Sequence, residues 1–216
     1  MSEVEKTTLD RNEATIRGYV VHVFKANKAT LLNVSTRNYN RPGKINENGK
    51  LNYVSDYPEI VFFGEQGERI ANGVKEGDFI TVKANMQSSK RGENVSQSLF
   101  GESIEFTESL LESVTGIESS RNYPEDKNEL ILNGEITSVR TFGPKMIGMI
   151  IRTNKSGHIS YVRATYYVSD AEKEMRNIPK HARVVCICRM QTTRRIKGST
   201  VKHYENVVVQ DLKVFK

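Results

Sequence analysis

The stretch 61–91, VFFGEQGERIANGVKEGDFITVKANMQSSKR, decides the fold because the same chain contains a second version of it. Moving it along by 104 residues aligns it without a gap with residues 165–195, TYYVSDAEKEMRNIPKHARVVCICRMQTTRR. Met86-Gln87 then falls on Met190-Gln191, and in both places two hydroxyl residues and two basic residues follow. A repeat at this period predicts duplicated domains rather than one large domain.

The match continues upstream at a different offset. IRGYVVHV around Gly18 resembles LNGEITSV around Gly134, 116 residues later. The extra 12 residues of this offset fall in the connection 37–57, which is longer in the first copy. Asn48-Gly49 is a strong signal for a tight turn, so we expect a protruding hairpin there, which would wrap a nucleic acid or a partner subunit.

Hydrophobic alternation predicts the same order of elements in both copies: three strands, a short helix and two strands. In the first copy we expect strands at 13–24, 29–36, 57–64, 79–88 and 102–106, with a helix inside 64–78 that Gly77 closes. In the second copy we expect strands at 130–141, 147–154, 159–168, 183–193 and 205–215, with a helix near 170–178. This order is typical of the oligonucleotide/oligosaccharide-binding (OB) fold, a five-stranded Greek-key barrel. Gly18 and Gly134 fit mid-strand positions where a barrel strand bends.

The predicted fold class is therefore mainly β, with two tandem OB-fold barrels and a helix between the third and fourth strands of each. We place the first domain at 1–106, an acidic linker with a short helix near its start at 107–128, and the second domain at 129–216. The first domain has 14 basic and 14 acidic residues, whereas the second has 16 basic and 7 acidic residues. A net charge of this size makes the second domain the stronger candidate for binding a polyanion.

Alternation also predicts which side chains face outward. On the third and fourth strands of the second copy these are Tyr161, Arg163, Thr165, Tyr167, Val185, Ile187, Arg189 and Gln191. The equivalent residues of the first copy are Tyr57, Glu59, Val61, Phe63, Thr81, Lys83, Asn85 and Gln87, while Ile80, Val82, Ala84 and Met86 face inward. Aromatic rings interleaved with cations are what a single-strand binder needs, since bases stack on the rings and phosphates pair with the cations. The alternative is that these rings pack against other parts of the protein.

The repeated basic phrase falls between the fourth and fifth strands, where OB barrels carry a ligand-binding loop. We expect flexible basic loops at 88–97 and 192–204, suited to sequence-independent phosphate contacts. The complete set of candidate nucleic-acid-binding residues is Tyr57, Phe63, Lys83, Gln87, Lys90, Arg91, Arg152, Tyr161, Arg163, Tyr167, Arg189, Gln191, Arg194, Arg195, Lys197, Lys202 and Tyr204.

Searches for enzyme and metal motifs favour a non-enzyme without cofactor or metal. The segment 43–50, GKINENGK, has one residue too many for a phosphate loop, and Leu51 stands where that loop needs Ser or Thr. The four histidines show no paired metal spacing, and a nuclease would need a carboxylate cluster where the outer face offers only Glu59. Cys186 and Cys188 are interpreted as small core residues, because cysteines two apart on a strand bridge poorly.

No apolar run is long enough to span a bilayer, so we expect no membrane association and a cytoplasmic location in a bacterial cell or with its phage. The stretch 61–86, with Lys75-Glu76-Gly77-Asp78 before the fourth strand, resembles the single-stranded DNA-binding protein family in a tandem-OB form such as phages and mobile elements carry. Two features depart from the family's pattern: the chain has no Trp, and it ends DLKVFK rather than in an acidic tail. Tyr and Phe would therefore do the stacking.

The resemblance implies a non-catalytic protein that coats single-stranded DNA during replication or recombination. Its partners would be single-stranded DNA, with RNA as the alternative ligand, together with replication or recombination proteins and further copies of itself. The alternative function is a structural or assembly module whose OB barrels contact other proteins and have no affinity for nucleic acid.

Overall fold

The computed structural model describes eleven strands and one helix. The residues described are 10–45, 47, 51–91, 94–106, 126–168, 178–197 and 200–215. The chain forms two compact units, and the ranges of each are not continuous in sequence. The first unit comprises residues 15–84 and 99–128, and the second unit comprises residues 1–14, 85–98 and 129–216. Residues 85–98, which carry the first copy of the basic phrase, thus belong to the second unit. No helix in the described part of the chain is long and apolar enough to cross a membrane.

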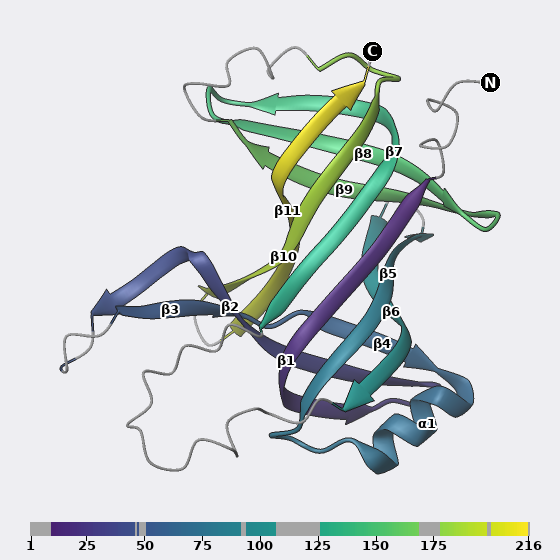
Figure 1. The fold of residues 1–216 in the computed structure, drawn as a ribbon, viewed down its shortest axis with the longest axis vertical. Helices are drawn as coiled ribbons and strands as arrows, with labels where there is room; N and C mark the ends of the chain where they lie inside the picture. The colour runs from purple at the N-terminus through teal and green to yellow at the C-terminus, as the bar shows by residue number, and fades with distance from the viewer. Residues whose placement is uncertain are drawn as a thin grey trace. The chain divides into compact units, whose positions relative to one another are not determined.

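The second unit contains a closed five-stranded barrel, in teal to yellow in Figure 1. Its strands are β7 (Lys127–Phe142), β8 (Met146–Lys155), β9 (His158–Tyr167), β10 (Arg183–Lys197) and β11 (Thr200–Phe215). β8 pairs antiparallel with β7 and β9, and β9 pairs parallel with β11. β10 pairs antiparallel with β11 and β7, which closes the ring. A mainly β chain with this barrel is consistent with the predicted OB fold.

The strands that contribute to the first unit follow the same order, with one hairpin added. They are β1 (Arg11–Lys25), β2 (Ala29–Ile45), β3 (Leu51–Asp56), β4 (Glu59–Phe63), β5 (Phe79–Arg91) and β6 (Asn94–Phe106). β1 pairs with β2, β2 with β4, and β4 runs parallel to β6, while β5 lies between β1 and β6 in the strand order. β3 pairs antiparallel with the far end of β2, so the predicted hairpin in 37–57 is confirmed. Its predicted turn, Asn48-Gly49, lies outside the described residues.

The helix α1 (Gly64–Gly73) lies between β4 and β5, as predicted for the first copy. Its predicted end was wrong, because the helix stops four residues before Gly77. The N–H of Val74 bonds to the carbonyl of Ile70 at 2.9 Å, and Val74 itself is already extended. Gly77 instead forms a separate turn with φ 93°. The helices predicted near 170–178 and at the start of the linker lie outside the described residues, apart from Ile178, which is not helical.

The turn before β5 is fastened to the first strand by two backbone hydrogen bonds. Val20 donates its N–H to the carbonyl of Asp78, and Gly77 donates to the carbonyl of Val20, both at 2.8 Å. A register shift follows at once in β1, between Val20 and His22. The extra residue of such a bulge bends the strand where it must turn between the two sides of a barrel.

The turn before β10 repeats this geometry in the other half of the chain. Ile136 donates to the carbonyl of Ala182 at 2.9 Å, and His181 donates to the carbonyl of Ile136 at 2.8 Å. The register of β7 shifts between Ile136 and Ser138. The two residues of this turn lie 104 positions after Gly77 and Asp78, and Ile136 lies 116 positions after Val20. These are the two offsets of the sequence repeat.

Gly18 and Gly134 lie where two strands approach closely. A Cβ atom on Gly18 would lie 2.1 Å from the carbonyl oxygen of Ser35, and one on Gly134 would lie 2.2 Å from that of Arg152. Both glycines precede the bulge of their strand by two residues or fewer. The prediction that glycine is needed at these mid-strand positions agrees with this contact.

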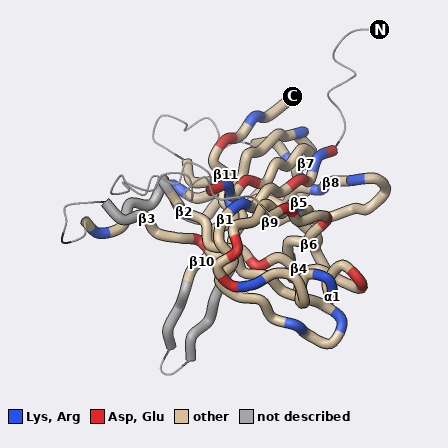
Figure 2. The backbone as a smooth tube through the Cα atoms, turned by 60° about the horizontal axis from the view of Figure 1, so that its bottom comes forward, with Lys and Arg blue, Asp and Glu red and all other residues tan. Residues whose placement is uncertain are grey.

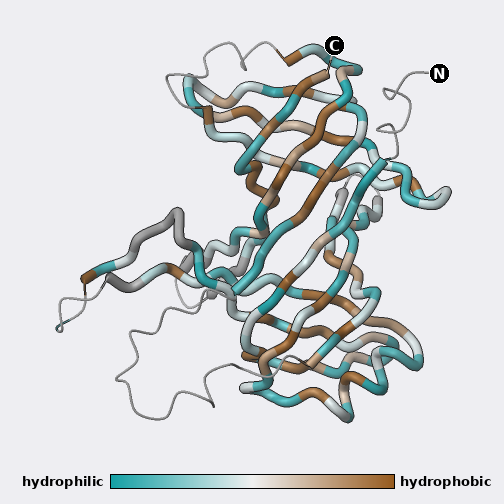
Figure 3. The backbone as a smooth tube through the Cα atoms, in the orientation of Figure 1, coloured by the Kyte–Doolittle hydropathy of each residue, from teal (hydrophilic) through white to brown (hydrophobic). Residues whose placement is uncertain are grey.

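The inward faces of the strands form the cores, and hydrophobic residues recur along the strands of both units (Figure 3). The predicted inward side chains of β5 are buried, namely Ile80, Val82, Ala84 and Met86. Cys186 and Cys188 are buried free thiols, as predicted. A hydrogen bond with Cys186, together with burial, raises the pKa of the Cys188 thiol well above its ordinary value. Both residues are core side chains, and Cys188 remains a neutral thiol at neutral pH.

Candidate nucleic-acid interface

The third strand of the second barrel, β9, presents its aromatic residues outward as predicted. Tyr161 is 44% exposed and Tyr167 is 56% exposed. Between them Val162 and Ala164 point into the core, at 0% and 3% exposure. Arg163 lies on the outer side between the two rings and is also exposed.

Pairing across β8 brings further residues beside this outer row. Arg152 of β8 lies directly opposite Tyr161, and Met146 lies opposite Tyr167. Residues directly opposite one another in an antiparallel pair share a face, with Cβ atoms about 5 Å apart. Arg152 and Tyr161, both predicted as binding residues, are thus neighbours on the outside of the barrel.

The next strand, β7, adds a ring and a cation to the same face. Phe142 lies opposite Met146, and the guanidinium carbon of Arg140 lies 5.2 Å from the centroid of the Phe142 ring. The Phe142 ring covers Gly148 of β8, where a Cβ atom would come within 2.7 Å of the ring edge. We call this surface the β7–β9 face; its residues are Arg140, Phe142, Arg152, Tyr161, Arg163 and Tyr167.

Arg140 and Phe142 are not among the predicted binding residues. Both lie at the end of the first strand of the second copy, whereas the predicted rings lie on the third strand and near the fifth. The available signal was VRTF at 139–142, in which a cation and a ring are two residues apart and therefore share a face of a strand. Register with β8 was needed to place them beside Tyr167.

The first unit has a smaller aromatic site at β4 and in the residues just before it. Tyr57 and Phe63 are 46% and 51% exposed, and Ile60 and Phe62 between them are fully buried. The Phe63 ring stacks on Phe100 of β6 with centroids 5.5 Å apart and an interplanar angle of 26°. Phe100 is a third residue that was not predicted, and it lies outside the strand expected at 102–106.

A carboxylate interrupts the outer row of β4. Glu59 lies opposite Asn33 of β2 and is half-buried, and its desolvation raises the pKa of this carboxyl above its ordinary value. A negative charge here opposes phosphate binding, so the first unit offers a less favourable surface to a polyanion than the β7–β9 face does.

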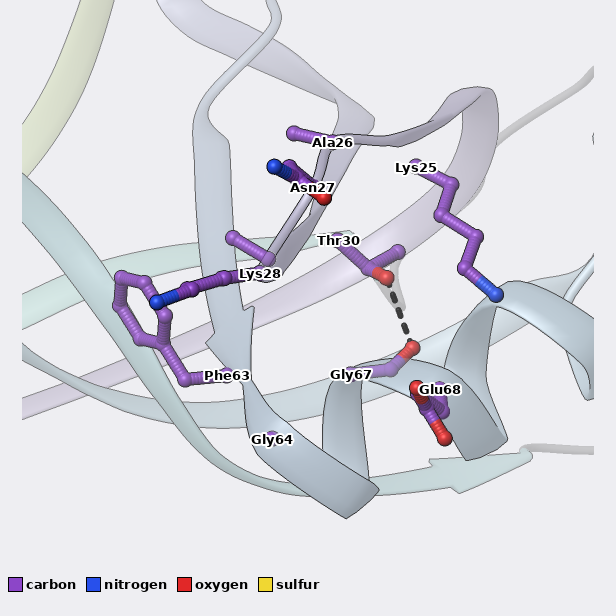
Figure 4. A pocket seen from close by; sticks show the side chains of 10 residues that line it. Lys25, Ala26, Asn27, Lys28, Thr30, Phe63, Gly64, Gly67 and Glu68 are labelled. Carbon is purple, nitrogen blue, oxygen red and sulfur yellow. Dashed lines mark hydrogen bonds between the residues drawn. The ribbon is translucent and has the colours of Figure 1, made fainter.

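A pocket of about 420 Å³ opens beside Phe63 in the first unit (Figure 4). It lies between the β1–β2 turn and the first turn of α1, and its basic lining residues are Lys25 and Lys28. Thr30 donates a hydrogen bond to the carbonyl of Gly67 at 2.7 Å, which fixes the helix against β2. The volume falls within the range of small-ligand sites, but the carboxylate of Glu68 also lines the pocket beside the two lysines.

The described residues of the segments expected as flexible basic loops are strand instead, which corrects that part of the prediction. β10 runs on to Lys197 and β11 begins at Thr200, so only two residues connect them. The register pairs Arg194 with His203 and Arg195 with Lys202. β-Branched residues such as Thr192 and Thr193 favour this extended pairing. β5 and β6 form the corresponding hairpin, with two residues between Arg91 and Asn94.

The remaining predicted residues occupy different environments. Arg189 is only 8% exposed and has interaction partners, so it is not available on the outer surface. Lys83 donates to the hydroxyl of Thr15 at 3.0 Å, and Tyr204 of β11 is 42% exposed. Gln87 and Gln191 are half-buried. The side chains of Lys90, Arg91, Arg194, Arg195, Lys197 and Lys202 lie outside the described set.

The described side chains were also compared with the requirements of a metal site. Within the ranges that the structure describes, no group of three or more His, Cys, Asp or Glu side chains could hold a metal ion. Acidic and basic residues both occur in each unit (Figure 2). The clearest chemical feature among these residues is the row of rings and guanidinium groups on the β7–β9 face.

Neither a family model nor a curated protein sequence matches the chain. Solved structures do match it, among them a deletion variant of the single-stranded DNA binding protein from Thermus aquaticus. That match has a TM-score of 0.66 and 14% identity, and it covers 96% of each chain. The wild-type protein from the same organism matches with a TM-score of 0.65 and 13% identity, over 96% of this chain and 94% of the other. The resemblance drawn from the sequence is confirmed at the level of the fold: over nearly its whole length the chain has the fold of these single-stranded DNA binding proteins.

Proposed function

We propose that the chain is a non-catalytic single-stranded DNA-binding protein built from two OB barrels in tandem, each corresponding to one copy of the sequence repeat. The observation that carries the proposal is the β7–β9 face, where three exposed or half-exposed rings alternate with three arginines on one side of a barrel. The fold shared with single-stranded DNA binding proteins supports the same function.

The chemistry of the β7–β9 face suits an unpaired strand. Tyr161, Tyr167 and Phe142 offer flat rings, and stacking of a base on such a ring contributes about 1–3 kcal/mol. Arg152 and Arg163 lie in the adjacent positions, where their guanidinium groups can pair with phosphates while bases occupy the rings. A duplex hides the faces of its bases, so a ring surface of this kind favours single strands over double strands.

The extended β10–β11 hairpin would supply the second set of phosphate contacts. It carries Arg194, Arg195, Lys197 and Lys202 within two paired segments. A paired hairpin loses less conformational entropy on binding than a flexible loop does. We therefore assign the basic phrase to backbone binding that is independent of sequence and sensitive to salt.

The two copies would contribute unequally. The second copy combines the β7–β9 face with a net charge of +9, whereas Glu59 interrupts the aromatic row of the electrically neutral first copy. Holding both barrels on one strand raises the effective concentration of the weaker site. Coating DNA during replication or recombination, in the cytoplasm of a bacterium or a phage-infected cell, is the role that we assign to this activity.

Titration of fluorescent oligonucleotides at several salt concentrations tests the proposal. We expect single-stranded DNA to bind more tightly than the matching duplex, with an affinity that falls steeply as salt rises. A parallel titration with an RNA strand of the same sequence shows whether the protein binds DNA or RNA more tightly. Size-exclusion chromatography of the free protein separates the alternative: assemblies that form without any affinity for oligonucleotides would indicate a structural module and overturn the proposal.

A further inference from the structure

Part of the β9 edge is closed by side chains from the β5–β6 hairpin rather than by a neighbouring strand. β9 pairs with β8 along its whole length, but with β11 only at Ala164–Tyr166. Within the described part of the chain, the preceding residues, which include Tyr161 and Arg163, pair with no strand on their second side. An unpaired strand edge leaves backbone groups exposed and free to shift.

Two residues of the hairpin satisfy these backbone groups. The N–H of Tyr161 donates to the hydroxyl of Ser88 at 3.0 Å. The side-chain amide of Gln97 accepts from the N–H of Arg163 at 2.8 Å and donates to the carbonyl of Arg163 at 3.1 Å. Gln97 thus makes both hydrogen bonds that a neighbouring strand would make at that residue. All four residues belong to the second unit.

The hairpin itself is arranged to present these two side chains together. The hydroxyl groups of Ser89 on β5 and Ser96 on β6 lie 2.8 Å apart, which identifies them as neighbours across the hairpin. Ser88 and Gln97 are the next residues on each strand. Because side chains alternate along a strand, both project to the other face of the hairpin, the face that meets β9.

The residues held in this way are the ones that matter for the β7–β9 face. Tyr161 and Arg163 carry the ring and the cation at one end of that face, and the core residue Val162 lies between them at 0% exposure. A shift or twist of this backbone would move the ring and the guanidinium group out of line with Arg152 and Tyr167. Three hydrogen bonds at two residues oppose that movement.

We propose that Ser88 and Gln97 are positioning residues for nucleic-acid binding: the first copy of the repeat braces the binding strand of the second. This inference rests on the proposed function and adds to it a role for the first copy's hairpin that is separate from any contact with DNA.

The principal test is Gln97→Met, which removes both hydrogen bonds and keeps the side-chain volume, together with Ser88→Ala. Each variant is expected to weaken binding of an oligothymidylate by about three- to tenfold, the range expected when hydrogen bonds of this kind are lost. The amide hydrogens of Tyr161 and Arg163 should exchange faster, whereas those paired with β8 should not change. Ser96→Ala is the matched control, because it alters the same hairpin without touching β9, and its affinity should stay within about twofold of the parent.

A double-mutant cycle separates positioning from a general loss of structure. In a background of Tyr161→Ala and Arg163→Ala, adding Gln97→Met should cause no further loss of affinity, because the side chains that it positions are gone. If Gln97→Met weakens binding as much in that background as in the parent protein, the inference is overturned. It is also overturned if the parent protein binds and both single variants bind equally well. Neither result would contradict the proposed function. A parent protein that does not bind oligonucleotides would instead overturn the proposed function on which the inference rests. Thermal unfolding of each variant identifies any that fails to fold, and Ser88→Ala then stands in for Gln97→Met.

Discussion

Gly77 and His181 occupy the same turn in the two halves of the chain, and both have a left-handed backbone, with φ angles of 93° and 70°. Each donates its N–H to the first strand of its half, at the carbonyl of Val20 or of Ile136, at 2.8 Å in both cases. The turn needs a positive φ to aim that N–H. Glycine adopts this conformation without strain, whereas in histidine it causes a strain of about 1–2 kcal/mol.

Replacing His181 with Gly should therefore stabilise the protein. We expect the free energy of unfolding to rise by about 0.5–1 kcal/mol, since relief of strain is partly offset by the extra freedom of glycine in the unfolded chain. The substitution also removes a contact of 2.6 Å between His181 and Glu135, but such surface pairs contribute little. Urea denaturation measures the change, and Gly77→Ala, which should lose about 1 kcal/mol, is the reciprocal control. A destabilised His181→Gly variant would show that the Glu135 contact outweighs the strain.

Much of the fold could be predicted because its signals are local. The alternation that buries Val162 and exposes Tyr161 is a property of consecutive residues, and so is the turn signal at 75–78 before the fourth strand of the first copy. The repeat also indicates the order of the elements, since both halves show the same pattern. Strand ends are less predictable: the expected fourth strand ends at residue 193, where OB barrels carry a loop, yet pairing across the hairpin extends β10 to Lys197.

The full candidate site could not be predicted, because it depends on register. Arg140 and Phe142 join Tyr167 only through their pairing with β8, and the bulge after Ile136 shifts that pairing by one residue. The contact of Gln97 with Arg163 joins residues 66 positions apart in sequence, through a side chain that bonds to backbone. No periodicity in the sequence encodes a contact of that kind.

Gly18 and Gly134 should tolerate no side chain. An added Cβ would lie 2.1–2.2 Å from a backbone carbonyl oxygen on the paired strand, which cannot move without disturbing the ladder. Alanine at either position is expected to lower the free energy of unfolding by about 2–4 kcal/mol. Gly73→Ala is the control, because the last residue of α1 has open space around it and should show little change. Denaturation midpoints of the three variants provide the comparison, and equal midpoints would contradict the close approach.

Glu59→Gln should stabilise the protein at neutral pH and strengthen its binding to DNA. Burial raises the pKa of Glu59, so the folded state holds its ionised form at a cost that the unfolded chain does not pay. The increase in the free energy of unfolding that glutamine causes should be absent below pH 4.5, the ordinary pKa of a glutamate carboxyl. It should grow as the pH rises from there to the raised pKa of Glu59, and it should stay constant at higher pH. Unfolding measured from pH 4 to pH 8 tests the sign, and a gain that is largest at low pH would contradict it. Tighter oligonucleotide binding at pH 7 would follow from the lost negative charge.

Tyr161→Leu and Tyr167→Leu should each weaken binding of single-stranded DNA by about five- to a hundredfold, because a base loses its stacking partner. Tyr→Phe at the same positions keeps the ring and should change the affinity little. Phe215→Leu is a matched control, since Phe215 is 47% exposed on β11 but is not part of the β7–β9 face. Fluorescence anisotropy with an oligothymidylate measures all of these. If Phe215→Leu lowers the affinity as much as the tyrosine variants do, the stacking is not specific to the β7–β9 face.

Arg194→Ala combined with Arg195→Ala should weaken binding by a similar factor for every DNA sequence tested. Phosphate contacts release counterions, and each contact to a single strand contributes about 0.7 to the slope of log K against log salt. Losing two such contacts should therefore lower the magnitude of that slope by about 1.4. Lys180→Ala combined with Lys213→Ala removes the same charge from exposed positions in the same unit and should leave the slope nearly unchanged. If both double variants flatten the slope equally, the effect belongs to the net charge of the second unit. If only the arginine variant does so, phosphate binding belongs to the β10–β11 hairpin, where the register places Arg195 and Lys202 on one rung of the ladder.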